Sequence, residues 1–264
     1  MMKYNPKYKK SVKNFFLYLF LALVAAIMVF PFLLMLDASL KYDREIFAVP
    51  FRLLPESMDS VKYNYSTIWK KIDFLGCYLN TAKLAVIITI LQLTTCSFAA
   101  FSFSRLEYPG RDKIFFLYLA TLMVPWHAIM IPQFMIIKQS GLYNSHGALI
   151  STQAFSAFGV FLLRQGMLTI PKELDDSAKI DGCNPPGMFW NIILPLSKPG
   201  LATLTIFTFK AVWNDYMAPM LYLEDKALYT IQLGLKAFKT QFSMAYGLTM
   251  AATVCSVIPI IIVY

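Results

Sequence analysis

The sequence predicts an all-helical membrane protein with six transmembrane helices, and three observations support this fold class. Of the 264 residues, 58% are hydrophobic and only 15% are charged, and the mean hydropathy is +0.55. A soluble domain carries about 25% charged residues. Several apolar runs are long enough to cross a hydrocarbon core about 30 Å thick. Lysines and arginines gather in short segments beside these runs, as the positive-inside rule expects.

The N-terminal part predicts one membrane span followed by a polar excursion. Residues 1–13 contain five lysines and no acidic residue, and an apolar run follows at residues 15–36. A secretory signal peptide has a similar shape, but its apolar region is only about 7–15 residues long. We therefore expect a retained helix with the basic tail in the cytoplasm. Residues 41–79 carry charges of both signs and are expected on the outer side.

Five further apolar runs predict the remaining transmembrane helices. They cover residues 80–103, 114–137, 147–163, 201–221 and 244–264. Pro125 and Pro132 predict a kink in the third span, because proline lacks the N–H that a helix interior needs. The short basic loop at residues 105–113 is expected in the cytoplasm and residues 222–243 outside. Six spans put both termini on the cytoplasmic side of the cell membrane.

Charge and motif content argue against several function classes. The net charge of +9 would suit nucleic-acid binding, but the lysines lie beside apolar spans, so no nucleic-acid partner is expected. The four cysteines show neither metal-ligand spacing nor a disulfide framework; they are Cys77, Cys96, Cys183 and Cys255. The sequence has no G-x-x-x-x-G-K-[ST] phosphate loop, no H-E-x-x-H and no G-x-S-x-G. We therefore expect no enzyme activity and no cofactor in this chain.

A polar segment at residues 171–199, here named the polar island, separates the fourth and fifth predicted spans. Pro171 suits the first turn of a helix, where its missing N–H would have no partner anyway. Three acids follow near the positive end of the helix dipole; they are Glu173, Asp175 and Asp176. Gly182 is expected to end this helix, and residues 184–187 to turn the chain before a second apolar segment.

The spacing within this helix predicts one ion pair and one outward face. Asp175 precedes Lys179 by four residues, which is the favourable order for a pair. One face of the helix is small and able to let another protein approach closely. It consists of Leu174, Ser177, Ala178 and Asp181.

The polar island resembles the EAA signature of membrane subunits of bacterial ATP-binding-cassette importers. That signature reads Glu-Ala-Ala, three residues, Gly, nine residues, then Ile-x-Leu-Pro, and its positions are taken here by Asp176-Ser177-Ala178, Gly182 and residues 192–195. The flanking Ile180-Asp181-Gly182 and Pro195-Leu196-Ser197-Lys198-Pro199 look like the sugar-importer branch. Asp176 replaces the usual Glu and Ser177 the first Ala. The shorter acid would need a closer approach to an ion-pair partner.

The resemblance implies a type I importer fold, also called MetI-like, in two parts. Residues 1–76 would hold the basic tail, the first transmembrane helix and the outer segment. Residues 77–264 would form the importer transmembrane domain, with five helices and a coupling loop at 165–200. The chain looks most like the smaller membrane subunit of maltose-type importers in the bacterial cell membrane. Such a subunit would form half of the pathway for a carbohydrate, with an oligosaccharide favoured.

The resemblance also implies partners within and beside the lipid bilayer. They are a second, non-identical permease subunit, two ATPase subunits that bind ATP and Mg, an extracytoplasmic solute-binding protein and the carbohydrate substrate. The residues expected to couple to the ATPase are Glu173, Asp176, Ser177, Ala178, Asp181, Gly182, Ile192, Leu194 and Pro195. The alternative is that the polar island is an ordinary amphipathic linker between two spans.

Polar residues near the outer end of the fifth predicted span are candidate pathway-lining residues. A charge at bilayer depth costs at least about 2.5–3.5 kcal/mol, so Lys210 and Asp215 should face protein or water. Lys210 and Asn214 are four residues apart and share a helix face. In one interpretation Lys210, Asn214 and Asp215 line the pathway. In the other, Asp215 caps or pairs locally and Lys210 contacts a partner helix.

Other polar residues within the spans allow the same two interpretations, and other functions stay open. Interhelical hydrogen bonding is favoured over pathway lining for Gln92, His127, Gln133 and Gln153.

One alternative function is an importer for a polyol or glycerol phosphate. An ion-driven secondary carrier would need half-repeats and acids at the midplane, where only Asp215 is well placed. An enzyme of lipid or glycan metabolism lacks visible catalytic motifs.

Overall fold

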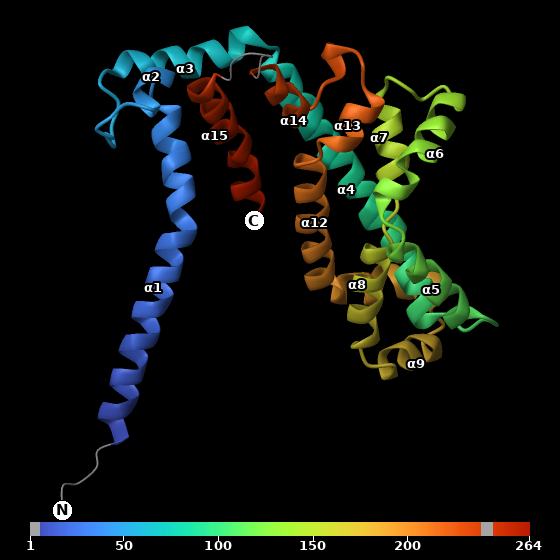
Figure 1. Ribbon diagram of the computed structural model, residues 1–264. Helices are drawn as coiled ribbons and strands as arrows, with labels where there is room; N and C mark the ends of the chain where they lie inside the picture. Colours follow the sequence, from blue (N-terminus) through green and yellow to red (C-terminus); the bar gives the residue numbers. More distant parts are fainter. Residues whose placement is uncertain (1–5, 239–244) are drawn as a thin grey trace, which may run out of the picture. The chain divides into compact units, whose positions relative to one another are not determined.

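The computed structural model describes residues 6–238 and 245–264, and every regular element in these two ranges is helical (Figure 1). The all-helical class predicted from the sequence is therefore confirmed for this part of the chain. The chain divides into two compact units. One comprises Met1–Lys71 with Phe238–Val257, and the other comprises Ile72–Ala237 with Ile258–Tyr264.

In the first unit, a long apolar helix ends in a polar junction. Helix α1 (Pro6–Ser39) contains the predicted first span, and α2 (Asp43–Ile46), α3 (Met58–Lys71) and the start of α15 (Tyr246–Val263) complete the unit. The Asn64 amide donates to the carbonyls of Ser39 and Lys41 at 2.9 and 2.8 Å. The fully buried Lys41 ammonium pairs with Asp37 at 2.6 Å and also donates to the Arg52 carbonyl. These bonds satisfy the backbone where α1 ends.

In the second unit, α4 (Phe74–Arg105) is the central helix. Helices α8 (Ala157–Leu168) and α12 (Lys198–Trp213) both pack against it. The packing is close at Gly159, where an added Cβ would lie 2.8 Å from the Cys96 sulfur and 3.1 Å from Leu204. Small residues allow this kind of approach between helices in membranes. A core cluster of buried side chains from all three helices continues into the polar island.

Shorter helices complete the second unit. They are α5 (Arg111–Ala120), η1 (Thr121–Met123), α6 (Trp126–Gln139), α7 (His146–Gln153), α9 (Glu173–Ile180), α10 (Pro185–Met188), η2 (Phe189–Ile193, a π-helical turn), α11 (Leu194–Leu196), α13 (Met217–Tyr222), η3 (Lys226–Leu228) and α14 (Ile231–Leu235). Another 3-10 turn, η4 (Lys236–Phe238), follows α14.

The described helices provide three to six candidate membrane spans. Three single helices are long and apolar enough, at Lys13–Ser39, Phe74–Arg105 and Tyr246–Val263. Three bent pairs qualify if each pair is one span, and their bends measure 98°, 41° and 75°. The six predicted spans are compatible with this range. The last of them was predicted to begin at residue 244, which lies outside the described residues.

Three of the predicted spans are not continuous helices. The third is broken rather than kinked, with a 98° bend between η1 and α6. Its cause is Pro125, because proline disfavours helical backbone in the preceding residue, and Val124 is extended at φ −86° and ψ 112°. The fourth is interrupted between α7 and α8. The fifth, predicted as residues 201–221, stops at Trp213 and resumes at Met217, and the bent pair joins α12 to residues 185–196 instead.

Gly159→Val should destabilise the chain, because the new side chain would overlap Cys96 and Leu204. Overpacking of this kind costs about 1–3 kcal/mol. Gly166→Val on the same helix is the matched control, since nothing lies within 4 Å of its Cβ position. Thermal unfolding of the purified chain in detergent measures both variants. Equal losses of stability at the two positions would contradict the close approach of α8 to α4 and α12.

Candidate functional site

The polar island begins with α9, whose two ends are set by local chemistry. Pro171 lies two residues before the helix rather than in its first turn. At the other end, the prediction for Gly182 is confirmed: its φ is +74°, the left-handed region that glycine adopts without strain. The Cys183 N–H donates to the Ala178 carbonyl at 2.8 Å, and the Gly182 N–H to the Lys179 carbonyl at 3.0 Å. This pair of bonds is a Schellman motif.

Residues 184–187 start a second helix rather than only turning the chain. The Asn184 side chain accepts from the Gly187 N–H at 2.8 Å, and Pro185 takes the first helical position. The helix continues into the π-helical turn η2. Pro195 explains the wider turn, because its ring would clash with the Asn191 carbonyl in a regular α-helix. Phe189 and Ile193 from this turn are buried in the core cluster.

The structure divides the predicted coupling residues between an outward and an inward set. On α9, Leu174 is 40% and Ile180 86% exposed. Among the predicted coupling residues, the exposed ones are Glu173, Asp176, Ser177, Asp181, Gly182 and Pro195. Ala178 was predicted on the outward face, but it is 5% exposed and belongs to the core cluster. Ile192 and Leu194 also pack against that cluster.

A buried ion pair holds α9 against the end of α4. Arg105 Nη1 lies 2.9 Å from Asp175 Oδ2, and the two side chains are 2% and 10% exposed. Arg105 Nη2 donates to the carbonyls of Met167 and Ile170 at 2.6 and 2.9 Å, which satisfies the end of α8. One guanidinium thus joins α4, α9 and the chain at the end of α8.

The sequence-based pairing of Asp175 with Lys179 is therefore wrong. Lys179 pairs with Asp176 instead, at 3.2 Å and with both side chains mostly exposed. Asp175 points inward to a partner 70 residues earlier in the chain. Sequence reasoning missed Arg105, although a charge at the end of an apolar span was a usable signal. The i, i+4 spacing rule describes pairs within one helix, so it cannot predict a partner on another helix.

A second arginine secures the neighbouring helices. Arg164 on α8 donates to the Phe103 carbonyl and to Asp112 Oδ1, both at 3.1 Å. Its guanidinium also lies 4.1 Å from the centre of the Phe115 ring. Arg164 thereby ties α8 to the end of α4 and the start of α5, beside the polar island.

The candidate pathway residues lie where α12 ends. Asn214 donates to the Lys210 carbonyl at 3.0 Å and accepts from Gln232 at 3.4 Å, and both Lys210 and Asn214 are exposed. Asp215 Oδ1 accepts from the Ala218 N–H at 3.2 Å. This bond caps the first turn of α13, as the structural alternative for Asp215 expects. Pathway lining by these residues stays a prediction.

Glutamine side chains connect the broken helices. Gln92 on α4 donates to the Gln153 carbonyl at 2.7 Å and accepts from Thr208 at 2.9 Å. Gln153 in turn donates to Asp215 Oδ2 at 2.8 Å. Gln133 accepts from the Trp126 indole at 2.9 Å and from the Tyr222 hydroxyl at 3.0 Å. Hydrogen bonding, the favoured interpretation of Gln92, Gln133 and Gln153, is confirmed.

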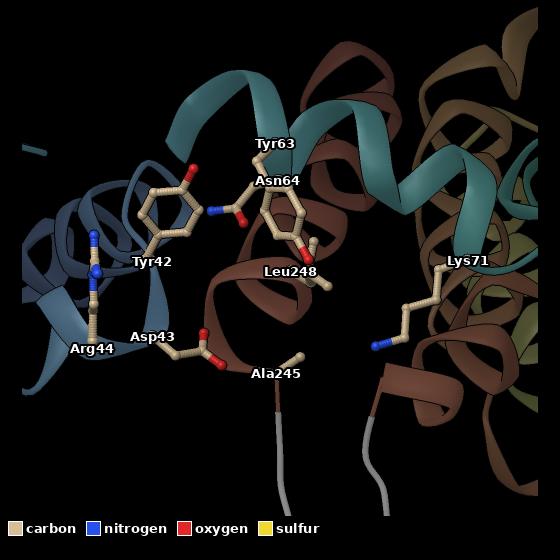
Figure 2. A pocket seen from close by; sticks show the side chains of 8 residues that line it. All are labelled: Tyr42, Asp43, Arg44, Tyr63, Asn64, Lys71, Ala245 and Leu248. Carbon is tan, nitrogen blue, oxygen red and sulfur yellow. The ribbon is translucent and has the colours of Figure 1, made fainter. Parts of the chain in front are cut away.

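The first unit contains a cavity of about 580 Å³ (Figure 2). Figure 2 shows that it is lined by Tyr42, Asp43 and Arg44 at α2, by Tyr63, Asn64 and Lys71 on α3, and by Ala245 and Leu248 at α15. Two of its polar lining residues already form hydrogen bonds between elements of this unit. Asp43 on α2 accepts from the Gly247 N–H of α15 at 2.7 Å, and Asn64 on α3 donates to the backbone where α1 ends. In the described ranges, no group of three His, Cys, Asp or Glu side chains could hold a metal ion.

Comparisons with known proteins agree with this architecture. The family described as "Binding-protein-dependent transport system inner membrane component" matches residues 93–264. The polygalacturonan/rhamnogalacturonan transport system permease protein YtcP of Bacillus subtilis is 34% identical, over 97% of this chain and 93% of that protein. The arabinooligosaccharides transport system permease protein AraQ of Halalkalibacterium halodurans is 30% identical, over 92% and 88%.

A solved structure has the same fold. The crystal structure of a bacterial ABC transporter involved in the import of the acidic polysaccharide alginate includes a chain that aligns with a TM-score of 0.85. The alignment covers 100% of this chain and 97% of that chain, at 23% sequence identity. The fold is therefore that of a membrane permease subunit of an ATP-binding-cassette importer. The chain belongs to the family of binding-protein-dependent transport system inner membrane components, so it is a transport subunit and not an enzyme.

Arg105→Ala should loosen α9, because it leaves the Asp175 carboxylate buried without its partner. Removing one member of a buried pair costs about 3–5 kcal/mol. Hydrogen exchange at residues 173–182 and thermal unfolding measure the effect. Lys179→Ala is the control, since it breaks an exposed pair on the same helix and should change stability little. Unchanged exchange in Arg105→Ala would contradict the anchoring role.

Proposed function

We propose that this chain forms half of the translocation pathway of an ATP-driven carbohydrate importer and couples to an ATPase subunit through the polar island. The proposed assembly contains a second, non-identical permease, two ATPase subunits that bind ATP and Mg, and an extracytoplasmic solute-binding protein. Both termini of this chain and the polar island would face the cytoplasm. The single observation that carries the proposal is that α9 exposes one face while Asp175 and Ala178 anchor its other face to the helices of the second unit.

The exposed side chains of α9 suit a docking contact. Ile180 and Leu174 present apolar area, and Asp176 and Asp181 provide acids beside them. An exposed isoleucine between acids favours a partner surface with an apolar groove and basic residues at its rim. Because Ala178 and Asp175 fasten the opposite face of α9, a push on Ile180 would move the end of α4 with it.

The substrate class rests on relatives of this chain. Two of the similar permeases named above belong to oligosaccharide or polysaccharide transport systems, which supports a carbohydrate and, among carbohydrates, an oligosaccharide. The runner-up is a polyol or glycerol phosphate. It is favoured by the sn-glycerol-3-phosphate transport system permease protein UgpE of Salmonella typhi, which is 32% identical over 92% of this chain and 89% of that protein.

Asp176→Lys should leave membrane insertion intact and abolish transport, because it reverses the charge in the docking face. Co-purification with the ATPase subunit and ATP-driven sugar uptake in reconstituted vesicles measure the two effects. Asp59→Lys on α3 makes the same charge change at an exposed position in the other unit and should transport normally. Normal uptake by Asp176→Lys would contradict coupling through α9. Uptake driven by an ion gradient without ATP would contradict the importer itself.

Asn214→Ala should raise the sugar concentration needed for half-maximal uptake while ATPase binding stays unchanged. The reason is that its amide would contact substrate in the pathway interpretation. Uptake kinetics and co-purification separate the two readouts. If the variant only lowers the yield of folded protein, the bonds of Asn214 to Lys210 and Gln232 are its whole role, and the structural interpretation is correct.

A further inference from the structure

Three helix breaks of the second unit meet at one cavity of about 290 Å³. The break before α6 contributes Trp126 and His127, and the end of α7 contributes Thr152 and Gln153. The break between α12 and α13 contributes Asp215 and Ala218. We name this space the break cavity. All of its lining residues lie within the one compact unit formed around α4.

The breaks themselves point to a ligand. Unwound backbone inside a membrane leaves polar groups without partners, and it is tolerated only where it is buried in protein or lines a water-filled cavity. In secondary transporters, which also move solutes across a membrane, substrate sites are commonly built where interrupted helices meet. Here the interrupted helices α5–α6, α7–α8 and α12–α13 converge on the same space. From the sequence, two of these interrupted segments were predicted to be continuous spans and the third to be a kinked helix.

The orientation of Trp126 is fixed by its neighbours. Its indole N–H donates to Gln133 at 2.9 Å, and Gln133 also accepts from Tyr222. The His127 ring packs edge-on against it, with centroids 5.5 Å apart. With the N–H already bonded, the ring contributes an apolar surface to the cavity. A fixed aromatic ring of this kind stacks on the C–H face of a sugar ring.

Other residues that line the break cavity supply hydrogen-bonding groups. The Asp215 carboxylate accepts bonds from the Gln153 side chain and from the backbone N–H groups of Ala218 and Met217, and with about four lone-pair sites it retains acceptor capacity. The Thr152 hydroxyl donates to the Ala148 carbonyl at 2.8 Å, and its oxygen can accept. Acceptors that line the same cavity as an aromatic ring suit the hydroxyl groups of a saccharide.

The charge in the cavity selects among saccharides. Among its described lining residues, Asp215 is the one carboxylate and none is a lysine or arginine. A carboxylate without a facing cation repels an anionic ligand in a site of low dielectric. The cavity therefore disfavours uronates and phosphates and favours neutral sugars.

We propose that the break cavity is a substrate subsite for one ring of a neutral saccharide, with Trp126 as the stacking platform and Asp215 as the hydroxyl acceptor. This assignment rests on the proposed carbohydrate pathway and narrows it to uncharged sugars. It separates this chain from relatives whose names specify polygalacturonan or glycerol phosphate.

The test is saccharide binding by the full chain in lipid nanodiscs, measured by saturation-transfer NMR with lactose, arabinotriose and trigalacturonate as probes. Wild type should bind the two neutral probes and not trigalacturonate. Trp126→Leu should weaken neutral binding by about 3- to 10-fold, the range expected for loss of one aromatic contact. Trp190→Leu, which removes an exposed tryptophan elsewhere in the same unit, should bind as wild type does.

Asp215→Asn tests the charge of Asp215 through the preference for neutral over anionic saccharides, which would not change if Asp215 had only a structural role. The substitution keeps the size of the side chain and removes its charge. Binding of trigalacturonate should therefore become detectable and should increase in comparison with binding of lactose. Preference of wild type for trigalacturonate, absence of neutral binding, or unchanged binding in Trp126→Leu would each overturn the subsite. The assay needs no ATPase, so its result is independent of whether Asp176→Lys uncouples transport, and the two proposals fail separately.

Discussion

The buried contact between Arg105 and Asp175 determines where the polar island lies. Moving two charges out of water is costly, and their attraction offsets this only with good geometry and further hydrogen bonds. Arg105 supplies further hydrogen bonds by donating to the carbonyls of Met167, near the end of α8, and of Ile170, two residues after α8. These bonds fix where α9 lies against α4 and α8, although Arg105 Nε and Asp175 Oδ1 are buried without a hydrogen-bond partner.

This anchoring gives the polar island two distinct faces. The inner face of α9, with Asp175 and Ala178, joins the core cluster that α4, α8 and α12 share. The outer face of α9 is exposed and carries an isoleucine, Ile180, that is 86% exposed. A short helix that is anchored through its inner face is suited to transmit force, because a displacement of α9 would also displace the helices to which it is anchored.

At the other end of α12, polar side chains form hydrogen bonds where the helices are interrupted. Gln92, Gln153 and Asp215 form a chain of hydrogen bonds from α4 to the start of α13. Each bond satisfies a group that would otherwise be exposed to an apolar surrounding, where an unpaired polar group is expensive. This chain of hydrogen bonds includes Asp215, which lines the break cavity together with Trp126, so stability and candidate substrate contact depend on the same residue.

The sequence alone determined the all-helical membrane class, the approximate positions of the apolar helices and the polar island, including the end of its first helix at Gly182. These features follow from composition and from local rules, namely apolar run length, helix-end chemistry and the left-handed preference of glycine. Only the tertiary structure decided that Asp175 pairs with Arg105, that Ala178 faces inward and that three breaks meet at one cavity. Those outcomes depend on contacts between residues far apart in the chain, and local spacing carries no information about them.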